Sequence, residues 1–185
     1  MNRFADFSRR HLLTASFICI VEVIFYREYA HFGAEFHFWL HGLFGGALGL
    51  AALTLWQLST NRQPKLNSWE AGALGHLYSA VPDFLFIFFG ILHMYWMDVF
   101  AIHISIHFIP APVPTMLVVF LLTLVAYGLV NDGRRRLAIT SLIAALVLVG
   151  VALLFRQPIP TNLQQLQAHN RGYAWLCPMW DLKTY

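Results

Sequence analysis

Histidine and aspartate residues recur in this chain at spacings that suit a metal site. There are nine histidines among 185 residues. His37 and His41 stand at positions i and i+4, which places both imidazoles on one face of a helix. His103 and His107, in the run HISIH, share a face whether that segment is helical or extended. Imidazole nitrogens and carboxylate oxygens are ligands that suit zinc or iron. The sequence therefore predicts a divalent metal site, with ligands His41, His93, Asp98, His103 and His107.

A Pro-Asp pair, Pro82-Asp83, lies in the same part of the chain. A continuous helix rises about 1.5 Å per residue, so it would place Asp83 about 15 Å below His93. Ionisable groups at membrane depth usually mark a functional site. We therefore expect Asp83 to be the catalytic residue, as a general base or as a further metal ligand. The alternative is that Asp83 satisfies a backbone group freed by Pro82.

Other ionisable residues have structural interpretations that stay open. His31 and His37 can serve as polar anchors at a membrane interface as readily as they can bind a metal. Glu22 can be a buried carboxylate that hydrogen-bonds to a neighbouring helix. His11 and His169 fit solvated or structural positions better than a site.

The composition indicates the class of protein in which these residues lie. Hydrophobic residues make up 58% of the chain, aromatic residues 16% and charged residues 11%, whereas a soluble domain is about 45–50% apolar and about 25% charged. This excludes a soluble enzyme, a disordered chain and a repeat solenoid. The net charge of +3 comes without a basic stripe, so no nucleic-acid partner is expected. The predicted fold class is an all-α integral membrane protein whose first partner is the lipid bilayer.

The apolar runs predict a bundle of five transmembrane helices within residues 1–155, followed by an extramembrane tail, 156–185. The expected spans are 12–26, 36–58, 71–97, 113–130 and 137–155. Small residues in the second span, such as Gly45 and Gly49, should let another helix approach closely. Pro82 should kink the third span and turn Asp83 into the bundle. The run 131–133 predicts the turn between the last two spans.

Lysine and arginine placement predicts the orientation. Three segments carry most of the basic residues ahead of the tail: Arg3, Arg9 and Arg10 before the first span, Arg62 and Lys65 after the second, and 134–136 after the fourth; the loops of the opposite side carry only Arg27. In a five-span chain all three lie on one side. The positive-inside rule then places the N-terminus in the cytoplasm and the C-terminus outside. We expect the bacterial inner membrane, with the histidines near its outer face.

Residues 75–108 resemble the bacterial membrane-bound metal-dependent hydrolases of the YdjM type. Those proteins are small multi-span chains with a Pro-Asp motif, paired histidines near a helix end, and a histidine followed by an aspartate. Pro82-Asp83 looks like the first motif, and His93 with Asp98 looks like the third. Leu85 stands where the family has a second aspartate. The resemblance implies a metal-dependent hydrolase in the membrane.

Three functions remain open at this stage. The first is a metallohydrolase that acts on a lipid-like substrate at the outer interface. The second is a haem- or quinone-binding subunit of a membrane redox complex, with His41 and His93 as axial ligands of b-type haem. The third is a structural subunit of such a complex. No CxxCH motif is present, which excludes covalent c-type haem.

Overall fold

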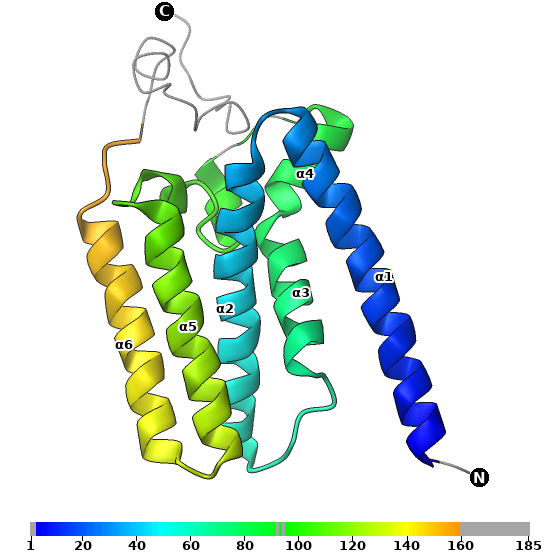
Figure 1. Cartoon of the computed structure of the whole chain (residues 1–185). Coiled ribbons are helices and arrows are strands. Elements are labelled where there is room, and N and C mark those ends of the chain that lie inside the picture. Colours follow the sequence, from blue (N-terminus) through cyan, green and yellow to red (C-terminus); the bar gives the residue numbers. More distant parts are fainter. Residues whose placement is uncertain (1–2, 92, 94, 160–185) are drawn as a thin grey trace, which may run out of the picture.

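The part of the chain that the structure describes is an all-helical bundle (Figure 1). The computed structural model describes residues 3–91, 93 and 95–159. In chain order the elements are α1 (Arg3–His31), α2 (Glu35–Thr60), α3 (Ser68–Ser79), α4 (Val81–Phe89), the 3₁₀ helices η1 (Tyr95–Val99) and η2 (Ser105–Phe108), α5 (Pro112–Asn131) and α6 (Arg135–Leu154). The predicted all-α class is therefore confirmed. Most of the predicted tail, 160–185 with His169, lies outside the described residues.

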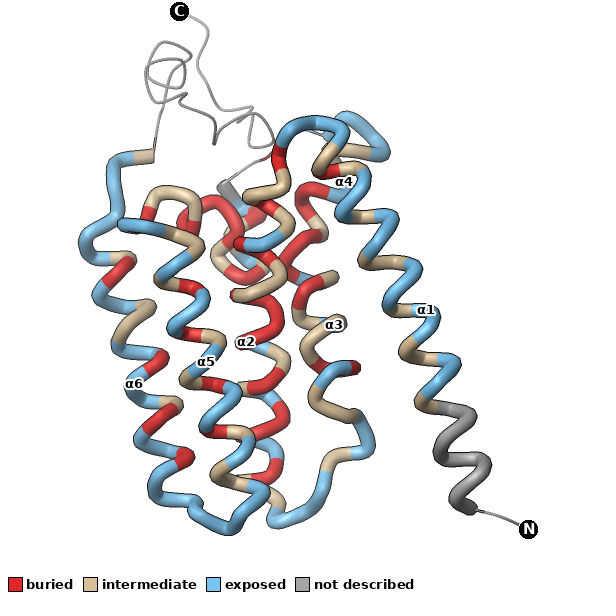
Figure 2. Tube along the Cα trace, in the orientation of Figure 1, coloured by how far each residue is buried: buried red, intermediate tan, exposed pale blue. Residues whose placement is uncertain are grey.

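Three helices, α2, α5 and α6, are long and apolar enough to cross a membrane. The bent pair α3 and α4 would form a fourth span if it crosses as one unit. Figure 2 shows pale blue, exposed residues along the outer sides of α5 and α6, and these include Leu121, Val125 and Leu146. Leucine and valine on such continuous outer faces suit contact with lipid. The predicted first span is helical, but Glu22 and Glu28 lie within α1, and α1 is not among the three. The count of five spans stays a prediction.

Glycines hold α2 and α3 in close contact. A Cβ atom on Gly45 would overlap the backbone of Gly75, and one on Gly75 would overlap the carbonyl of Gly45. One turn further along, a Cβ on Gly49 would overlap the carbonyl of Ala71. Only residues without a side chain allow two helix backbones to approach this closely. The close approach predicted for the second span is therefore present, and its partner is α3.

The bend between α3 and α4 lies at Ala80, two residues before Pro82, and measures 55°. Pro82 lacks a backbone N–H, so it fits the first turn of a new helix but not the interior of a continuous one. Helix α4 ends at Phe89, and Gly90 adopts the left-handed conformation that closes it. The predicted third span, 71–97, is therefore wrong in its second half, because the chain turns back at Gly90.

The chain from η1 to η2, residues 95–108, lies at the end of the bundle near α4, and we call it the folded segment. It contains η1 and η2 and two consecutive residues, Ala101 and Ile102, at φ angles of 58° and 45°. A β-branched residue at positive φ is strained, and such strain persists only where the surroundings impose it. The side chain of Arg156, just after α6, donates to Ser105 Oγ at 2.7 Å. This contact fixes the folded segment against the last helix.

The basic loops lie at the opposite end of the bundle from this folded segment. The α2–α3 loop carries Arg62 and Lys65, and the α5–α6 turn carries Arg134, as Figure 1 shows. The predicted turn at 131–133 is present, with Gly133 at positive φ. Arg135 donates to the carbonyl of Leu58 at 2.8 Å and so caps the last turn of α2.

Candidate metal centre

Three separate parts of the chain bring histidines to one buried carboxylate. Asp83 lies in the first turn of α4 and is fully buried. Its Oδ1 lies 3.1 Å from His93 Nε2 and 3.2 Å from His103 Nε2, and its Oδ2 lies 3.4 Å from His41 Nε2. All three imidazoles are buried as well. Figure 2 shows a concentration of buried residues, in red, where α2, α4 and the folded segment meet.

The predicted depth of Asp83, about 15 Å below His93, is wrong. That expectation assumed one continuous helix through both residues. Gly90 ends α4, and the returning chain carries His93 back to 3.1 Å from the carboxylate. Asp83 is thus at the centre of the histidines, in the position of a ligand and not of a base beneath them.

The protonation of His103 follows from its partners. Its Nδ1 lies 2.9 Å from the backbone carbonyl of Ser79, which can only accept a hydrogen bond. Nδ1 must therefore carry the proton, and in the neutral imidazole Nε2 is a lone pair. That lone pair lies 3.2 Å from an oxygen of Asp83 and forms no hydrogen bond within the described chain. In this neutral form two buried acceptors face each other and repel unless a cation lies between them. In the imidazolium form a second proton on Nε2 would face Asp83 instead.

Ser79 orients two of the histidines at once. Its carbonyl accepts from His103, and its hydroxyl lies 3.0 Å from His41 Nδ1. Both imidazoles thereby present Nε2 to Asp83. A histidine that binds a metal through one nitrogen commonly donates its other N–H to a carbonyl or another polar group. The rings of His41 and His103 stack at 4.1 Å between centroids, which fixes their relative direction.

Two further groups hold the carboxylate itself. The hydroxyl of Tyr29, near the end of α1, donates to Asp83 Oδ2 at 2.7 Å. His93 reaches Oδ1 with the geometry of a hydrogen bond. Tyr29 therefore orients Asp83, while His93 can either orient it or bind an ion directly.

The spacing of the ligand atoms suits a small divalent ion. His41, Asp83 and His103 offer one ligand atom each within 4.8 Å of one another. Ligands about 2.0–2.1 Å from a tetrahedral zinc ion lie about 3.3 Å from each other. The His41–Asp83 and His103–Asp83 distances of 3.4 and 3.2 Å are close to this value. Two histidines and one carboxylate are also a ligand set of non-haem iron.

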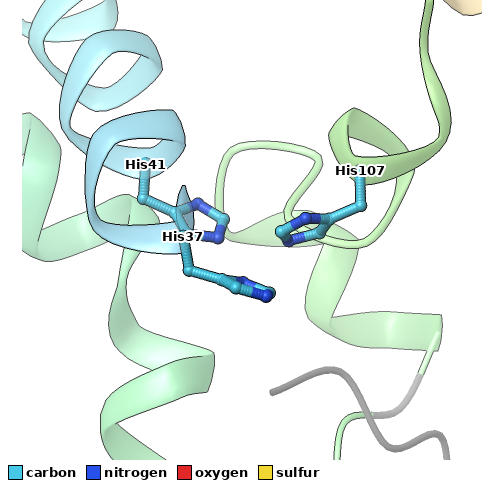
Figure 3. Close-up of side chains that lie close together, drawn as sticks. All are labelled: His37, His41 and His107. Carbon is cyan, nitrogen blue, oxygen red and sulfur yellow. The ribbon is translucent and has the colours of Figure 1, made fainter. Parts of the chain in front are cut away.

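A second group of histidines adjoins the first and shares His41. His37, His41 and His107 point toward one another from α2 and η2 (Figure 3). The rings of His37 and His107 lie 4.5 Å apart. Neither nitrogen of His107 has a hydrogen-bond partner among the residues described. Nδ1 of His41 contacts Ser79, so a single nitrogen of His41, Nε2, is left for both groups. The two groups therefore form either one site or two neighbouring positions for one ion.

The charge state of His107 suits a ligand. Burial, and secondarily the neighbouring imidazole of His37, lower the pKa of His107 well below its usual value. The imidazole is therefore neutral near pH 7. Neutral imidazole is the form that binds metals.

Asp98, a predicted ligand, is used elsewhere. Its Oδ1 accepts from the backbone N–H groups of Ile104 and Ser105 at 2.7 and 3.0 Å, and its Oδ2 accepts from Ser105 Oγ at 2.7 Å. These bonds cap the start of η2. The spacing from His93 to Asp98 suggested a ligand pair, but the 3₁₀ turn η1 directs Asp98 into the loop.

We expect Asp98→Asn to keep its full metal content, because the amide can replace the carboxylate as an acceptor for the two N–H groups. The melting temperature should fall by a few degrees through loss of the charged acceptor. Metal analysis of the purified variant checks this. If Asp98→Asn loses its metal, the assignment of Asp98 to the loop is wrong.

Sequence reasoning missed three residues of this centre. His37 was left open as a polar anchor, although its i, i+4 relation to His41 was visible. Tyr29 and Ser79 carry no pattern that separates them from structural residues. The chain matches no protein-family model, no curated protein and no solved structure. The resemblance to the YdjM-type hydrolases therefore rests on the residues alone.

Proposed function

We propose that this protein binds a divalent metal ion, zinc or iron, at the membrane surface and uses it for hydrolysis of a lipid-like substrate. The observation that carries the proposal is His103 Nε2, which lies 3.2 Å from a buried carboxylate oxygen and has no hydrogen-bond partner within the described residues, while its Nδ1 contacts the carbonyl of Ser79. His41 Nε2 faces the same carboxylate and also lacks a hydrogen bond within the described residues. A single ion bound to His41, Asp83 and His103 would satisfy all three groups.

A bound divalent ion would supply Lewis-acid activation of water, which is the chemistry of metal-dependent hydrolysis. Asp83 would then serve as a ligand, held by Tyr29 and His93. His107 is buried next to His41 and His103, with ring centroids 5.1 and 5.6 Å away. It is placed either to complete the ligand set or to accept a proton from water.

The surroundings of the cluster support a lipid-like substrate. Trp39, in the second turn of α2, and Trp96, in η1, are both more than half exposed at this end of the bundle. Trp56 and Trp69 are exposed toward the other end. Tryptophan concentrates at the two water interfaces of a bilayer. These tryptophans support a position of the cluster near headgroup depth, where the cleavable bonds of lipids lie.

The test is conversion of lipid by the purified protein. Protein loaded with zinc or iron(II) is incubated with vesicles of phosphatidylglycerol and phosphatidic acid, and the lipids are followed by mass spectrometry. We expect loss of a headgroup or an acyl chain that stops with a chelator and is absent in His103→Ala. If metal-loaded protein converts neither lipid, the hydrolase assignment for these substrates is wrong, and metal binding stands alone.

The geometry argues against the b-type haem alternative. Two axial histidines must leave a slot between them for the porphyrin. Here His41 and His93, the expected axial pair, contact opposite oxygens of one carboxylate. The rings of His93 and His103 stack at 5.0 Å, which leaves no such slot beside them. A structural subunit stays as the alternative if no metal binds.

We further propose that the basic end of the bundle is cytoplasmic and the histidine end faces outward. Two variants each carry one cysteine, at Lys65 or at His31, in a chain from which Cys19 and Cys177 are removed. The two cysteines should be labelled from opposite sides of the membrane. Both positions are exposed, and they lie in the α2–α3 loop and at the end of α1. Intact cells and an impermeant maleimide provide the measurement. If the maleimide labels Lys65→Cys but not His31→Cys in intact cells, the orientation is the opposite of the one proposed.

A further inference from the structure

A groove between α1, α2, α3 and α5 is lined by polar and apolar side chains that take no part in the proposed metal site. It has a volume of about 340 Å³, and its lining includes none of the residues around Asp83. It runs from Trp69 to His76 along α3, about 10 Å at 1.5 Å per residue. Leu50 and Phe120 form apolar walls. Volumes of this size are typical of small-molecule sites.

The floor of the groove is made of glycines. Gly42, Gly46 and Gly72 all line it. A Cβ added to Gly72 would meet nothing closer than 4.0 Å, so open space lies directly above this residue. A Cβ added to Gly42 would lie 3.6 Å from the ring of His76, in ordinary contact. The groove is therefore shaped by missing side chains, and a larger side chain at Gly72 would fill it.

Among the polar residues that line this mostly apolar groove, which include Glu22 and Ser68, His76 has a buried nitrogen without a partner. His76 is 6% exposed, and its Nδ1 lies 2.8 Å from Oε2 of Glu22 on α1. In the neutral imidazole that donates Nδ1–H to the carboxylate of Glu22, Nε2 is an acceptor. This Nε2 is buried and has no hydrogen-bond partner in the described part of the chain. A buried acceptor without a donor is unfavourable by about 1–3 kcal/mol.

We propose that the groove binds an apolar chain that carries one hydroxyl group, and that this O–H donates to Nε2 of His76. The apolar body would lie on the glycine floor between Leu50 and Phe120. Long-chain alcohols and quinols share this chemistry, since each joins a hydroxyl to a hydrophobic chain. This inference is independent of the metal site, because no metal ligand lines the groove.

The hydroxyl is tested by binding of matched probes to the full chain in detergent. Farnesol should bind about tenfold more tightly than farnesyl methyl ether, in which a methyl group replaces the donor hydrogen. Decylubiquinol should compete with farnesol, and the ratio of the two affinities identifies which source of hydroxyl the groove prefers. Equal binding of farnesol and its methyl ether would overturn the proposed hydrogen bond.

Two variants test the location. The double variant Glu22→Leu, His76→Phe keeps an aromatic ring at 76, removes both polar partners and should lose the preference for alcohol over ether. Gly72→Leu should abolish binding of both probes by filling the groove. Gly150→Leu, on α6 with open space around its Cβ, is the matched control and should bind as the wild type does.

Thermal melting serves as the check on folding. Both groove variants should still unfold cooperatively, so their failure to bind farnesol would reflect the groove and not a loss of the fold. Unchanged farnesol binding in Gly72→Leu would overturn the proposal.

Discussion

Replacing His103 with alanine is expected to remove nearly all bound metal from the purified protein. Ser79 fixes the ring of His103, so that its Nε2, the proposed ligand atom, lies 3.2 Å from Asp83. Loss of groups that only orient ligands already costs about 10- to 100-fold in affinity, and loss of a ligand should cost more. Elemental analysis after size-exclusion chromatography gives the metal-to-protein ratio directly.

The matched control is His31→Ala, because His31 is an exposed histidine at the end of α1 outside the cluster. It should keep the metal. Metal added at about 100 times its dissociation constant stabilises the native state by about 2.7 kcal/mol. The wild type and His31→Ala should therefore melt at a higher temperature with metal, whereas His103→Ala should not respond. A metal-dependent rise in His103→Ala equal to that of the wild type would exclude His103 as a ligand.

Replacing Gly75 with valine is expected to have the largest effect on folding. Any Cβ at this position overlaps the backbone carbonyl of Gly45, so α2 and α3 must separate. Overpacking in a close contact costs about 1–3 kcal/mol, and backbone atoms cannot move aside as side chains do. The separation would also move Ser79 away from His41 and lower metal affinity. Thermal melting and metal analysis measure both effects.

Gly128→Val is the control for this substitution. Gly128 lies in α5 with no atom within 4 Å of its added Cβ, so the change in helix propensity is the same and the overlap is absent. It should retain its metal and nearly its full melting temperature. Equal destabilisation of the two variants would show that the α2–α3 contact does not depend on Gly75.

Local patterns in the sequence predicted the helices because apolar runs, glycines and prolines act within a few residues. The bend before Pro82, the turn at Gly133 and the glycine-mediated contact of α2 all follow from properties of single residues. The end of α4 at Gly90 was missed. The residues beyond it, ILHMYWM, are still mostly apolar, so the hydropathy pattern continued the predicted helix to residue 97.

The sequence predicted most of the residues of the site but not their arrangement in space. His41, His93 and His103 do converge, but on Asp83, which a straight helix would have placed far away. Asp98 was expected as a ligand, and instead its carboxylate caps η2. Both errors have one physical cause. The path of residues 90–104 depends on positive φ angles at Gly90, Ala101 and Ile102, and two of these residues do not favour that conformation.

The central claim is that His41, Asp83 and His103 bind one metal ion, and the most direct measurement is elemental analysis of the purified protein combined with its absorption spectrum. We predict about one equivalent of zinc or iron per chain and no Soret band. Metal-free protein that takes up neither ion on reconstitution would contradict the account, because His103 would then face Asp83 as a protonated imidazole in a structural pair.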